Sequence, residues 1–387
     1  MSLVEEINAL RNDAALCRHG TRCLVRAGGG DLLPWLERIA SLPVSDLAPG
    51  GLLALTLMDG KGKLRADPRV LAPGVPAEGL LLELPSSHRE QILRLLRMYV
   101  ITDDVTLEDL GDGDGEGDGS TDDANGGAAS RTAPQPGDIA GDTSAARAAR
   151  EPWALITLAG PAAGERLTAC DLPAPGAGQV AAAGELLLAP SELSGTGGFD
   201  LIGPLSRLAE AERSLLASGV KTASPAALQV VRVGAGVPWF AEDMAGGVIP
   251  LEALLDHKVS STKGCYPGQE VIARIVNMGQ VARRLVRLTG TAGTAGAAGD
   301  VSAASNSGAD DGAGSAGAPG GHVHAALHPD AELQGEDGRA LGVLTSVARD
   351  PTNDTTLGLG YVKRSRWKTG AQVKVGDVTL DVTSLVG

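Results

Sequence analysis

Two tracts of low sequence complexity divide this chain into three segments that can fold. Residues 111–150 and 291–320 are rich in Gly, Ala, Ser and Asp and poor in large apolar side chains. Such segments cannot bury enough surface to offset the entropy lost on ordering, so we predict that both are disordered insertions. The remaining segments, 1–110, 151–290 and 321–387, carry the apolar patterns of folded domains.

The formal charge of −14 is concentrated in these tracts. Residues 111–150 contribute −5 and residues 291–320 contribute −3, which leaves −6 for the rest of the chain. We interpret the acidic tracts as solvated low-complexity sequence, with an interaction tail as the alternative. Aromatic residues make up 2% of the chain and supply few stacking platforms, so direct binding of nucleic acid is not expected.

The cysteines indicate a reducing compartment. Only four are present, Cys17, Cys23, Cys170 and Cys265, and no pair has the C-x-x-C spacing of a zinc or iron-sulfur site. No apolar run approaches the roughly 18 residues that a membrane span needs, and the first residues are charged and amphipathic. We therefore expect a cytoplasmic protein with no signal peptide and no contact with a membrane.

A cluster of three histidines, His322, His324 and His328, has the spacing H-x-H-x-x-x-H. Such a cluster can hold a metal ion. It lies where the second insertion rejoins the C-terminal segment, a place that favours surface histidines, so we predict no metal site.

Apolar periodicity predicts a mixture of helices and strands. A helical spacing runs from Val4 to Cys17 and again from Leu32 to Ile39, and Ser86 is a candidate N-cap for a helix over Arg89–Met98. Short apolar runs predict strands at residues 52–58, 80–84, 154–158 and 185–188.

The C-terminal segment has a different pattern. Valine- and threonine-rich runs at residues 340–347, 356–362 and 372–385 are broken by Gly370 and Gly376. This pattern predicts a small all-β barrel. The expected fold class is therefore α+β, with several domains and a C-terminal β-barrel.

The segment KGCYPGQE, residues 263–270, sets a thiol beside a cation in a glycine-bounded turn. A neighbouring lysine favours the thiolate, so Cys265 next to Lys263 is the candidate functional thiol. Gly264 and Gly268 permit a tight turn. A short helix is expected from Gln269, with Glu270 and Arg274 paired at i, i+4. The alternative is a tight turn that contains an inert cysteine.

Two basic patches can bind anions. The first comprises Arg283, Arg284 and Arg287, and the second Lys363, Arg364, Arg366 and Lys368. Either can hold a polyglutamate tail or an RNA backbone, and the alternative is a solvated strand face.

KGCYPGQE followed by VIAR resembles the signature of the YgfZ-type folate-binding proteins, relatives of the glycine cleavage T-protein, an aminomethyltransferase. RVGAGVP, at residues 232–238, resembles the arginine-to-proline stretch that precedes this signature. Further similarity lies at VRAGGGDLLPWLERIASLPVSDLAPG and LMDGKGKLRADPRV near the N-terminus, at GPAA and GFDLIGP, and at GRALGVLTSVARDP and LGLGYVKR near the C-terminus.

The resemblance implies three domains around a central channel. The N-terminal α+β folate-binding domain begins in residues 1–110, the second α+β domain spans 151–290 with the signature, and the barrel spans 321–387. It also implies binding of tetrahydrofolate or a derivative, which requires an apolar slot for the pterin and cations for its tail. The residues expected at the folate site are Lys263, Gly264, Tyr266, Gly268, Gln269, Glu270, Arg274, Arg232 and Asp67.

The YgfZ side of this resemblance implies a role in assembly or repair of iron-sulfur clusters in client enzymes, including enzymes that modify tRNA. The partners would be these clients or assembly factors. A thiolate at Cys265 can attack a one-carbon adduct, contact iron or a cluster transiently, or form a mixed disulfide, and the sequence leaves these roles open.

Two alternatives remain. One is a tetrahydrofolate-dependent aminomethyltransferase or demethylase like the T-protein. Ala66 and Asp67 stand where the T-protein has paired acids, and Gly234 stands where it has a glutamate, and both departures argue against that transfer. The other alternative is a non-catalytic scaffold.

Overall fold

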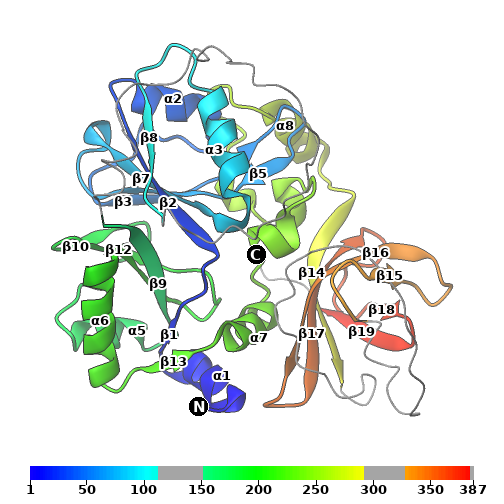
Figure 1. The fold of residues 1–387 in the computed structure, drawn as a ribbon. Coiled ribbons are helices and arrows are strands. Elements are labelled where there is room, and N and C mark those ends of the chain that lie inside the picture. Colours follow the sequence, from blue (N-terminus) through cyan, green and yellow to red (C-terminus); the bar gives the residue numbers. More distant parts are fainter. Residues whose placement is uncertain (112–150, 292–326, 384–387) are drawn as a thin grey trace, which may run out of the picture.

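A computed structural model describes residues 1–111, 151–291 and 327–383. Figure 1 shows three folded parts: two sheet-based units and a barrel beside them. The predicted insertions lie almost entirely outside the described residues. The fold class predicted from the sequence, α+β with a C-terminal β-barrel, is confirmed. None of the helices in the described ranges is long and apolar enough to cross a membrane.

The first unit is built on a five-stranded antiparallel sheet. Its strands, in spatial order, are β3 (Gly51–Ala54), β6 (Arg69–Ala72), β7 (Leu80–Pro85), β2 (Arg22–Gly28) and β8 (Thr106–Asp109). Helices α2 (Leu32–Ile39) and α3 (Arg89–Met98) cover one face, where Trp35, Leu36 and Ile92 are buried. A hairpin of β4 (Leu57–Met58) and β5 (Leu64–Ala66) and the short turns η1 (Pro76–Glu78) and η2 (Ser86–His88) complete the unit.

The second unit is a six-stranded sheet. In spatial order its strands are β10 (Ala181–Ala183), β11 (Leu186–Pro190), β12 (Gly198–Pro204), β9 (Trp153–Ala159), β1 (Ala15–Cys17) and β13 (Lys221–Ala223). Four helices accompany it: α1 (Leu3–Asn12), α5 (Ala163–Thr168), α6 (Leu205–Ala217) and α7 (Pro225–Ala235). The start of the chain thus packs with residues that follow the first insertion.

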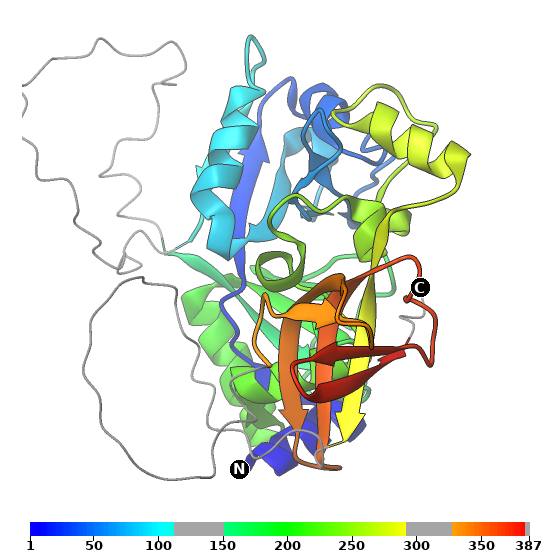
Figure 2. The same cartoon turned by 90° about the vertical axis from the view of Figure 1, so that its right-hand side faces the viewer.

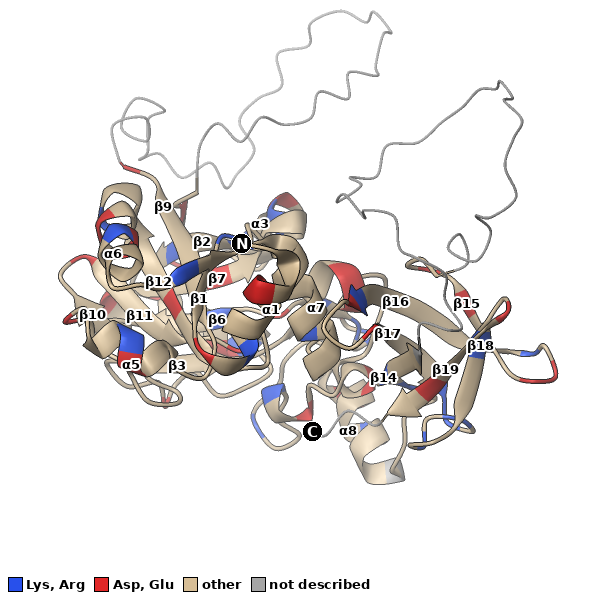
Figure 3. Ribbon diagram, turned by 90° about the horizontal axis from the view of Figure 1, so that it is seen from below, with Lys and Arg blue, Asp and Glu red and all other residues tan. Residues whose placement is uncertain are grey.

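Leucine and isoleucine side chains join the two sheets. Leu24 and Leu71 of the first sheet form one buried cluster with Leu187 and Ile202 of the second. Figure 3 shows blue lysine and arginine segments and red aspartate and glutamate segments scattered over the ribbon. The acidic residues of the described chain are therefore not gathered on one face in this view.

The third part is a closed six-stranded barrel. Its strands, in order around the barrel, are β14 (Arg283–Thr291), β17 (Thr355–Lys363), β16 (Ala340–Asp350), β15 (Glu332–Gln334), β18 (Gln372–Val375) and β19 (Val378–Thr383). Strand β14 precedes the second insertion, yet it pairs with β17 and β19 and therefore lies in the barrel, not in the second domain to which we assigned its residues. Figure 2 shows the barrel in front of the lower half of the molecule, below α8 (Gln269–Met278).

Close backbone approach in the barrel requires glycine. A Cβ on Gly342 would lie 1.9 Å from the carbonyl oxygen of Tyr361 on the paired strand. Leu357, Leu359 and Tyr361 of β17 also join the buried cluster around α7. The barrel is therefore anchored on the helix that leads into the RVGAGVP stretch.

Several local predictions are confirmed and others are wrong. The helices over Leu32–Ile39 and Arg89–Met98 have the expected bounds. The helix expected over residues 4–17 ends at Asn12, because Ala15–Cys17 instead pairs with β9 and β13. The run at 52–58 is divided between β3 and β4. Ser86 is not an N-cap, since its hydroxyl donates to the carbonyl of Gly20.

Candidate functional site

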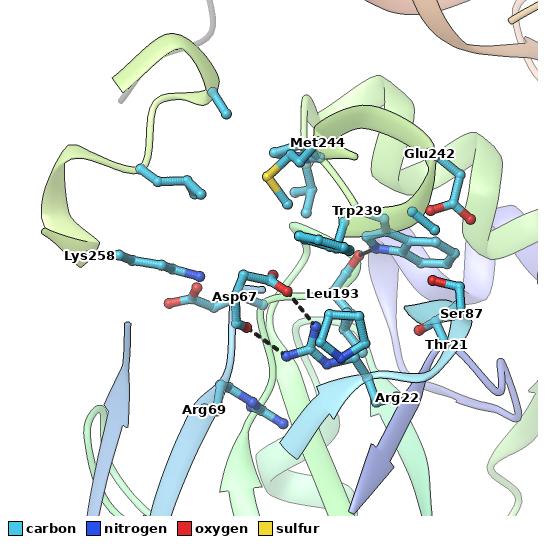
Figure 4. A pocket seen from close by; sticks show the side chains of 18 of the residues that line it. Thr21, Arg22, Asp67, Arg69, Ser87, Leu193, Trp239, Glu242, Met244 and Lys258 are labelled. Carbon is cyan, nitrogen blue, oxygen red and sulfur yellow. Dashed lines mark hydrogen bonds and ion pairs between the residues drawn. The ribbon is translucent and has the colours of Figure 1, made fainter. Parts of the chain in front are cut away.

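A cavity of about 510 Å³ lies where the two sheet units meet the segment that follows α7. This volume is within the range of small-molecule sites in proteins. Figure 4 shows side chains that converge on it from these segments. Its lining includes Thr21, Arg22, Asp67, Ser87, Glu192, Leu193, Trp239, Phe240, Glu242, Met244, His257 and Lys258.

One wall of the cavity is apolar and aromatic. Trp239 is only 8% exposed, and its indole N–H donates to the carbonyl of Leu193 at 3.1 Å. Phe240 and Met244 belong to η3 (Phe240–Met244), a π-helical turn, and are buried beside it. Gly236, with a φ of 83°, ends α7 in the left-handed conformation and lets the chain turn into this wall. A flat ring can pack against such a surface.

Arg232 lies behind this wall and is fully buried. Its guanidinium donates to the Asp243 carboxylate at 2.8 Å, to the Val237 carbonyl at 3.0 Å and to the Ser346 hydroxyl at 2.8 Å. It also lies 4.5 Å from the centre of the Trp239 ring. A buried arginine whose donors are engaged in this way positions the wall, and Arg232 is not among the residues that line the cavity.

The floor of the cavity is a chain of buried charges. Arg22 donates to the carboxylates of Asp67 at 2.9 Å and Glu83 at 2.8 Å. Arg69 bridges Glu83 to Asp200 on the second sheet. Burial raises the pKa of Glu83, but the attraction of Arg69 and Arg22 outweighs it and leaves that pKa below its ordinary value. The network joins the two sheets and fixes the Asp67 carboxylate at the cavity.

His19 continues this network as a neutral side chain. The Thr157 hydroxyl donates to Asp200 at 2.5 Å, so it accepts from His19 Nε2 at 2.9 Å. His19 Nδ1 then accepts from the backbone N–H of Thr21 at 3.2 Å. Burial lowers the pKa of His19, although Asp200 and Glu83 oppose the shift. The imidazole is thus fixed as the tautomer that carries its proton on Nε2.

The ammonium of Lys263 in the signature is engaged by backbone carbonyls near the end of α2. Its ammonium donates to the carbonyls of Glu37, Ala40 and Leu42 at 2.8, 2.9 and 3.1 Å. It also lies 3.0 Å from the Glu37 carboxylate. An ammonium has three N–H donors, so these carbonyls at the C-terminal end of α2 engage all of them. Lys263 therefore anchors the signature turn to α2.

The rest of the turn docks on the DGKGK hairpin, the loop of residues 59–63 between β4 and β5. Gly268 has a φ of 85°, and a Cβ there would lie 2.7 Å from the Cα of Gly62 and 2.8 Å from the carbonyl oxygen of Asp59. The Gln269 amide donates to the Lys263 carbonyl at 2.8 Å, and the Tyr266 hydroxyl donates to the Ser260 carbonyl. Burial raises the pKa of Tyr266. The two motifs are thus one structural unit.

The remaining signature residues are exposed. Cys265 and Gly264 face solvent. The side chains of Glu270 and Arg274 are 91% and 70% exposed, and the expected ion pair between them measures 3.7 Å. None of these four residues lines the cavity. Of the residues we expected at a folate site, Asp67 alone is among the lining residues of the described chain, and the signature does not contribute to the cavity lining.

Sequence reasoning missed most of the cavity. Trp239 and Phe240 directly follow RVGAGVP in a chain with four tryptophans and two phenylalanines, and that concentration was the available signal. Arg22 and Glu83 gave no signal, because only the sheet pairing of β2 with β7 brings them together. Of the histidine cluster, His328 is exposed and the other two lie outside the described residues. Within the described ranges, no three metal-ligating side chains converge.

The architecture is that of the glycine cleavage T-protein. The crystal structure of glycine cleavage system aminomethyltransferase T from Bartonella henselae superposes with a TM-score of 0.72, over 99% of this chain and 89% of that one. The sequences are 16% identical, so this similarity shows the fold alone.

Two curated proteins are similar in sequence. A putative chloroplastic transferase of Arabidopsis thaliana is 28% identical over 174 residues, which is 45% of this chain and 32% of that protein. An aminomethyltransferase of Cupriavidus pinatubonensis is 26% identical over 263 residues, covering 65% of this chain and 62% of that protein. The match therefore spans about a third of the length of the chloroplastic transferase and less than two thirds of the length of the aminomethyltransferase. No protein-family model matches it.

Proposed function

We propose that this protein binds tetrahydrofolate or a derivative in the cavity between Asp67 and Trp239. The observation that carries the proposal is the cavity itself, which combines an apolar aromatic wall with a carboxylate held in place by Arg22. The free edge of a pterin carries N–H donors, which a carboxylate accepts, and its faces are apolar. The similarity of the whole chain to an aminomethyltransferase of the glycine cleavage system supports the same ligand class.

The residues around the cavity fit such a ligand. Trp239 and Leu193 would pack against the pterin ring, and Asp67 would accept from its edge. Figure 4 shows Lys258 reaching toward the cavity from η5 (Asp256–Lys258). Its ammonium would hold a carboxylate of the glutamate tail, the role for which we first considered Arg232 and Arg274. The folate would supply the one-carbon chemistry.

We further propose that the protein is of the YgfZ type and serves assembly or repair of iron-sulfur clusters in cytoplasmic client enzymes, tRNA-modifying ones among them. Cys265 would be the functional thiol. Its exposure and its separation from the cavity favour contact with iron or with a partner's sulfur over attack on a folate adduct. Loss of client-enzyme activity in cells that carry Cys265→Ala, with folate binding intact, is the expected result, and full client activity contradicts it.

Aminomethyl transfer is the second candidate. In its favour, Asp67, Glu192 and Glu242 place three carboxylates around the cavity, and two of the similar proteins carry the name aminomethyltransferase. Against it, Ala66 is fully buried beside Asp67 and offers no second acid. Turnover of an aminomethyl-lipoyl or N-methyl substrate by the purified protein with tetrahydrofolate would establish this function.

Calorimetric titration of tetrahydrofolate under anaerobic conditions tests the binding proposal. Asp67→Asn removes a charge-assisted hydrogen bond, so we expect the Kd to rise roughly 10-fold or more. Leu193→Trp fills the cavity and should abolish binding without any change of charge. Arg339→Gln, at a side chain 85% exposed on the barrel, is the control. Absence of saturable binding to the wild-type protein would leave the non-catalytic scaffold as the better description.

A further inference from the structure

A second, larger groove lies on the other side of the segment that borders the cavity. It has a volume of about 1020 Å³ and runs between α8 and the barrel. Leu251 and Asp256 line this groove, whereas Leu254, Leu255 and Lys258 of the same segment line the first cavity. The two spaces therefore border different residues of the segment 251–258 and share no lining residue.

The groove is lined by three cations and one acid. Arg284, Arg364 and Lys368 are the cations, and Asp256 is the acid. Arg283 and Arg287, from the same basic patch, are already engaged, by the Glu252 carboxylate and the Gly234 carbonyl. Across residues 1–111, 151–291 and 327–383, by contrast, no carboxylate pairs with any of the three groove cations, and together with Asp256 they leave a net charge of +2.

Strand register places two of these cations on one face. Arg284 of β14 pairs with Val362 of β17, and the Arg364 N–H continues the ladder by donating to the Ala282 carbonyl at 3.2 Å. Residues two apart on a strand share a face, so Arg364 is the diagonal neighbour of Arg284. Diagonal neighbours lie roughly 7–8 Å apart, a separation that long side chains bridge onto one anion.

An aromatic ring lies beside these cations. Trp367 lines the groove, and the guanidinium of Arg284 lies 6.0 Å from the centre of its ring. Ile275, Val276 and Val281 supply an apolar wall, in which Val276 is 49% exposed. Cations next to an aromatic and apolar surface suit a ligand that combines an anionic group with a planar ring.

The charge of the whole chain decides between a small ligand and a polymer. The residues outside the two low-complexity tracts carry −6 and disfavour a long polyanion, while a small anion within the roughly 8–10 Å Debye length responds mainly to the groove. A phosphate monoester carries about −1.5 to −2 at pH 7, which matches the groove's excess of positive charge. Arginine side chains also bind phosphate in bidentate fashion.

We propose that this groove binds a small phosphorylated ligand of the nucleotide class, with its ring against Trp367 and its phosphate on Arg284, Arg364 and Lys368. The proposal is independent of folate binding, because the groove and the cavity are lined by different residues. A free nucleotide and an unpaired nucleotide of an RNA share this chemistry, and the experiment distinguishes these two sources.

The test is calorimetric titration of the full chain with AMP, ribose 5-phosphate, adenosine and a single-stranded RNA hexamer. AMP should bind saturably, with ribose 5-phosphate and adenosine each roughly 10-fold or more weaker, because each lacks one half of the recognised chemistry. Equal affinity for AMP and ribose 5-phosphate would overturn the ring assignment. Hexamer binding more than about 100-fold tighter than AMP, with a steep salt dependence, would overturn the small ligand in favour of RNA.

Substitutions test whether the residues that line the groove bind the ligand directly. Arg364→Gln and Lys368→Gln should each weaken AMP roughly 10-fold or more through loss of a charge-assisted hydrogen bond. Arg366→Gln is the matched control, because Arg366 lies in the same turn but does not line the groove. Its effect should stay under about 3-fold, and equal losses at all three positions would show only a diffuse positive field. The residues are exposed, so folding should persist, as thermal melting will verify. No AMP binding at roughly 10 mM would overturn the proposal.

Discussion

The contact between Gly268 and the DGKGK hairpin predicts that Gly→Ala substitutions at two glycines of the signature differ greatly in their effect on stability. Gly268 has a φ of 85°, where an L-residue costs about 1–2 kcal/mol. Its new Cβ would also lie 2.7 Å from Gly62 Cα and 2.8 Å from the Asp59 carbonyl, and such overpacking costs about 1–3 kcal/mol. Gly268→Ala should therefore destabilise the docked turn by about 2–5 kcal/mol.

Gly264→Ala is the matched control. No atom lies within 4 Å of a Cβ built there, and the residue is outside the left-handed region. Its effect should be within about 0.5 kcal/mol, or slightly stabilising through a restricted unfolded chain. The same Gly→Ala change is therefore expected to destabilise the turn at position 268 and to leave its stability almost unchanged at position 264, four residues away.

Hydrogen exchange measures this difference locally, without assuming that a multi-part chain unfolds in one step. The reporters are the Gly62 N–H, which donates to Asp59 at 2.9 Å, and the Val271 N–H, which donates to Gly268 at 3.1 Å. A loss of 2–5 kcal/mol accelerates exchange through local opening by roughly 30-fold to several thousand-fold. Indistinguishable exchange in the two alanine variants would refute the docking argument.

Two further predictions concern ionisable groups around the sites. Lys263→Met leaves three carbonyls at the end of α2 without their donor and should cost about 2–4 kcal/mol in urea unfolding. The alkylation rate of Cys265 should change less than about 2-fold, because the three carbonyls already engage the ammonium. A roughly 10-fold fall in that rate would instead indicate that Lys263 activates the thiol. The pKa of His19 is lowered below 6.5 by burial, so below that pH the unfolded chain binds more protons than the folded one. The stability that this group contributes is complete above about pH 6.5 and is lost as the pH falls. His19→Gln should therefore flatten the decline of the unfolding free energy between about pH 7 and 5.5. An unchanged slope would count against a buried neutral His19.

Local sequence patterns predicted the helices that bury a single apolar face against a sheet. Leu32–Ile39 and Arg89–Met98 are amphipathic helices that cover one sheet, so their apolar stripes mark them directly. Ala15–Cys17 continues the spacing of the helix before it, and only its pairing with β9 and β13 makes it a strand. That pairing involves residues beyond the first insertion, which a local window does not include.

The candidate site was predicted in part, because a motif identifies residues but not the directions of their side chains. Lys263 is two residues from Cys265, yet the carbonyls of α2 determine where its ammonium lies. Arg232 was expected to hold a ligand, but Asp243 in the following turn pairs with it in the interior. Asp67, expected at a folate site, lines the cavity, while its partner Arg22 meets it only through strand register.

The anchoring of the signature limits what Cys265 can do. Lys263, Tyr266, Gly268 and Gln269 each hold the turn, while Cys265 between them is exposed. Cys265 does not line the cavity, and any movement toward a ligand there that breaks these contacts would oppose the anchoring. Breaking the Lys263 bonds alone costs about 2–4 kcal/mol, which lowers the reactive population roughly 30- to 900-fold. If Cys265 is the functional thiol that we propose, an iron centre or a sulfur that approaches from solvent fits this anchoring better than a folate adduct in the cavity.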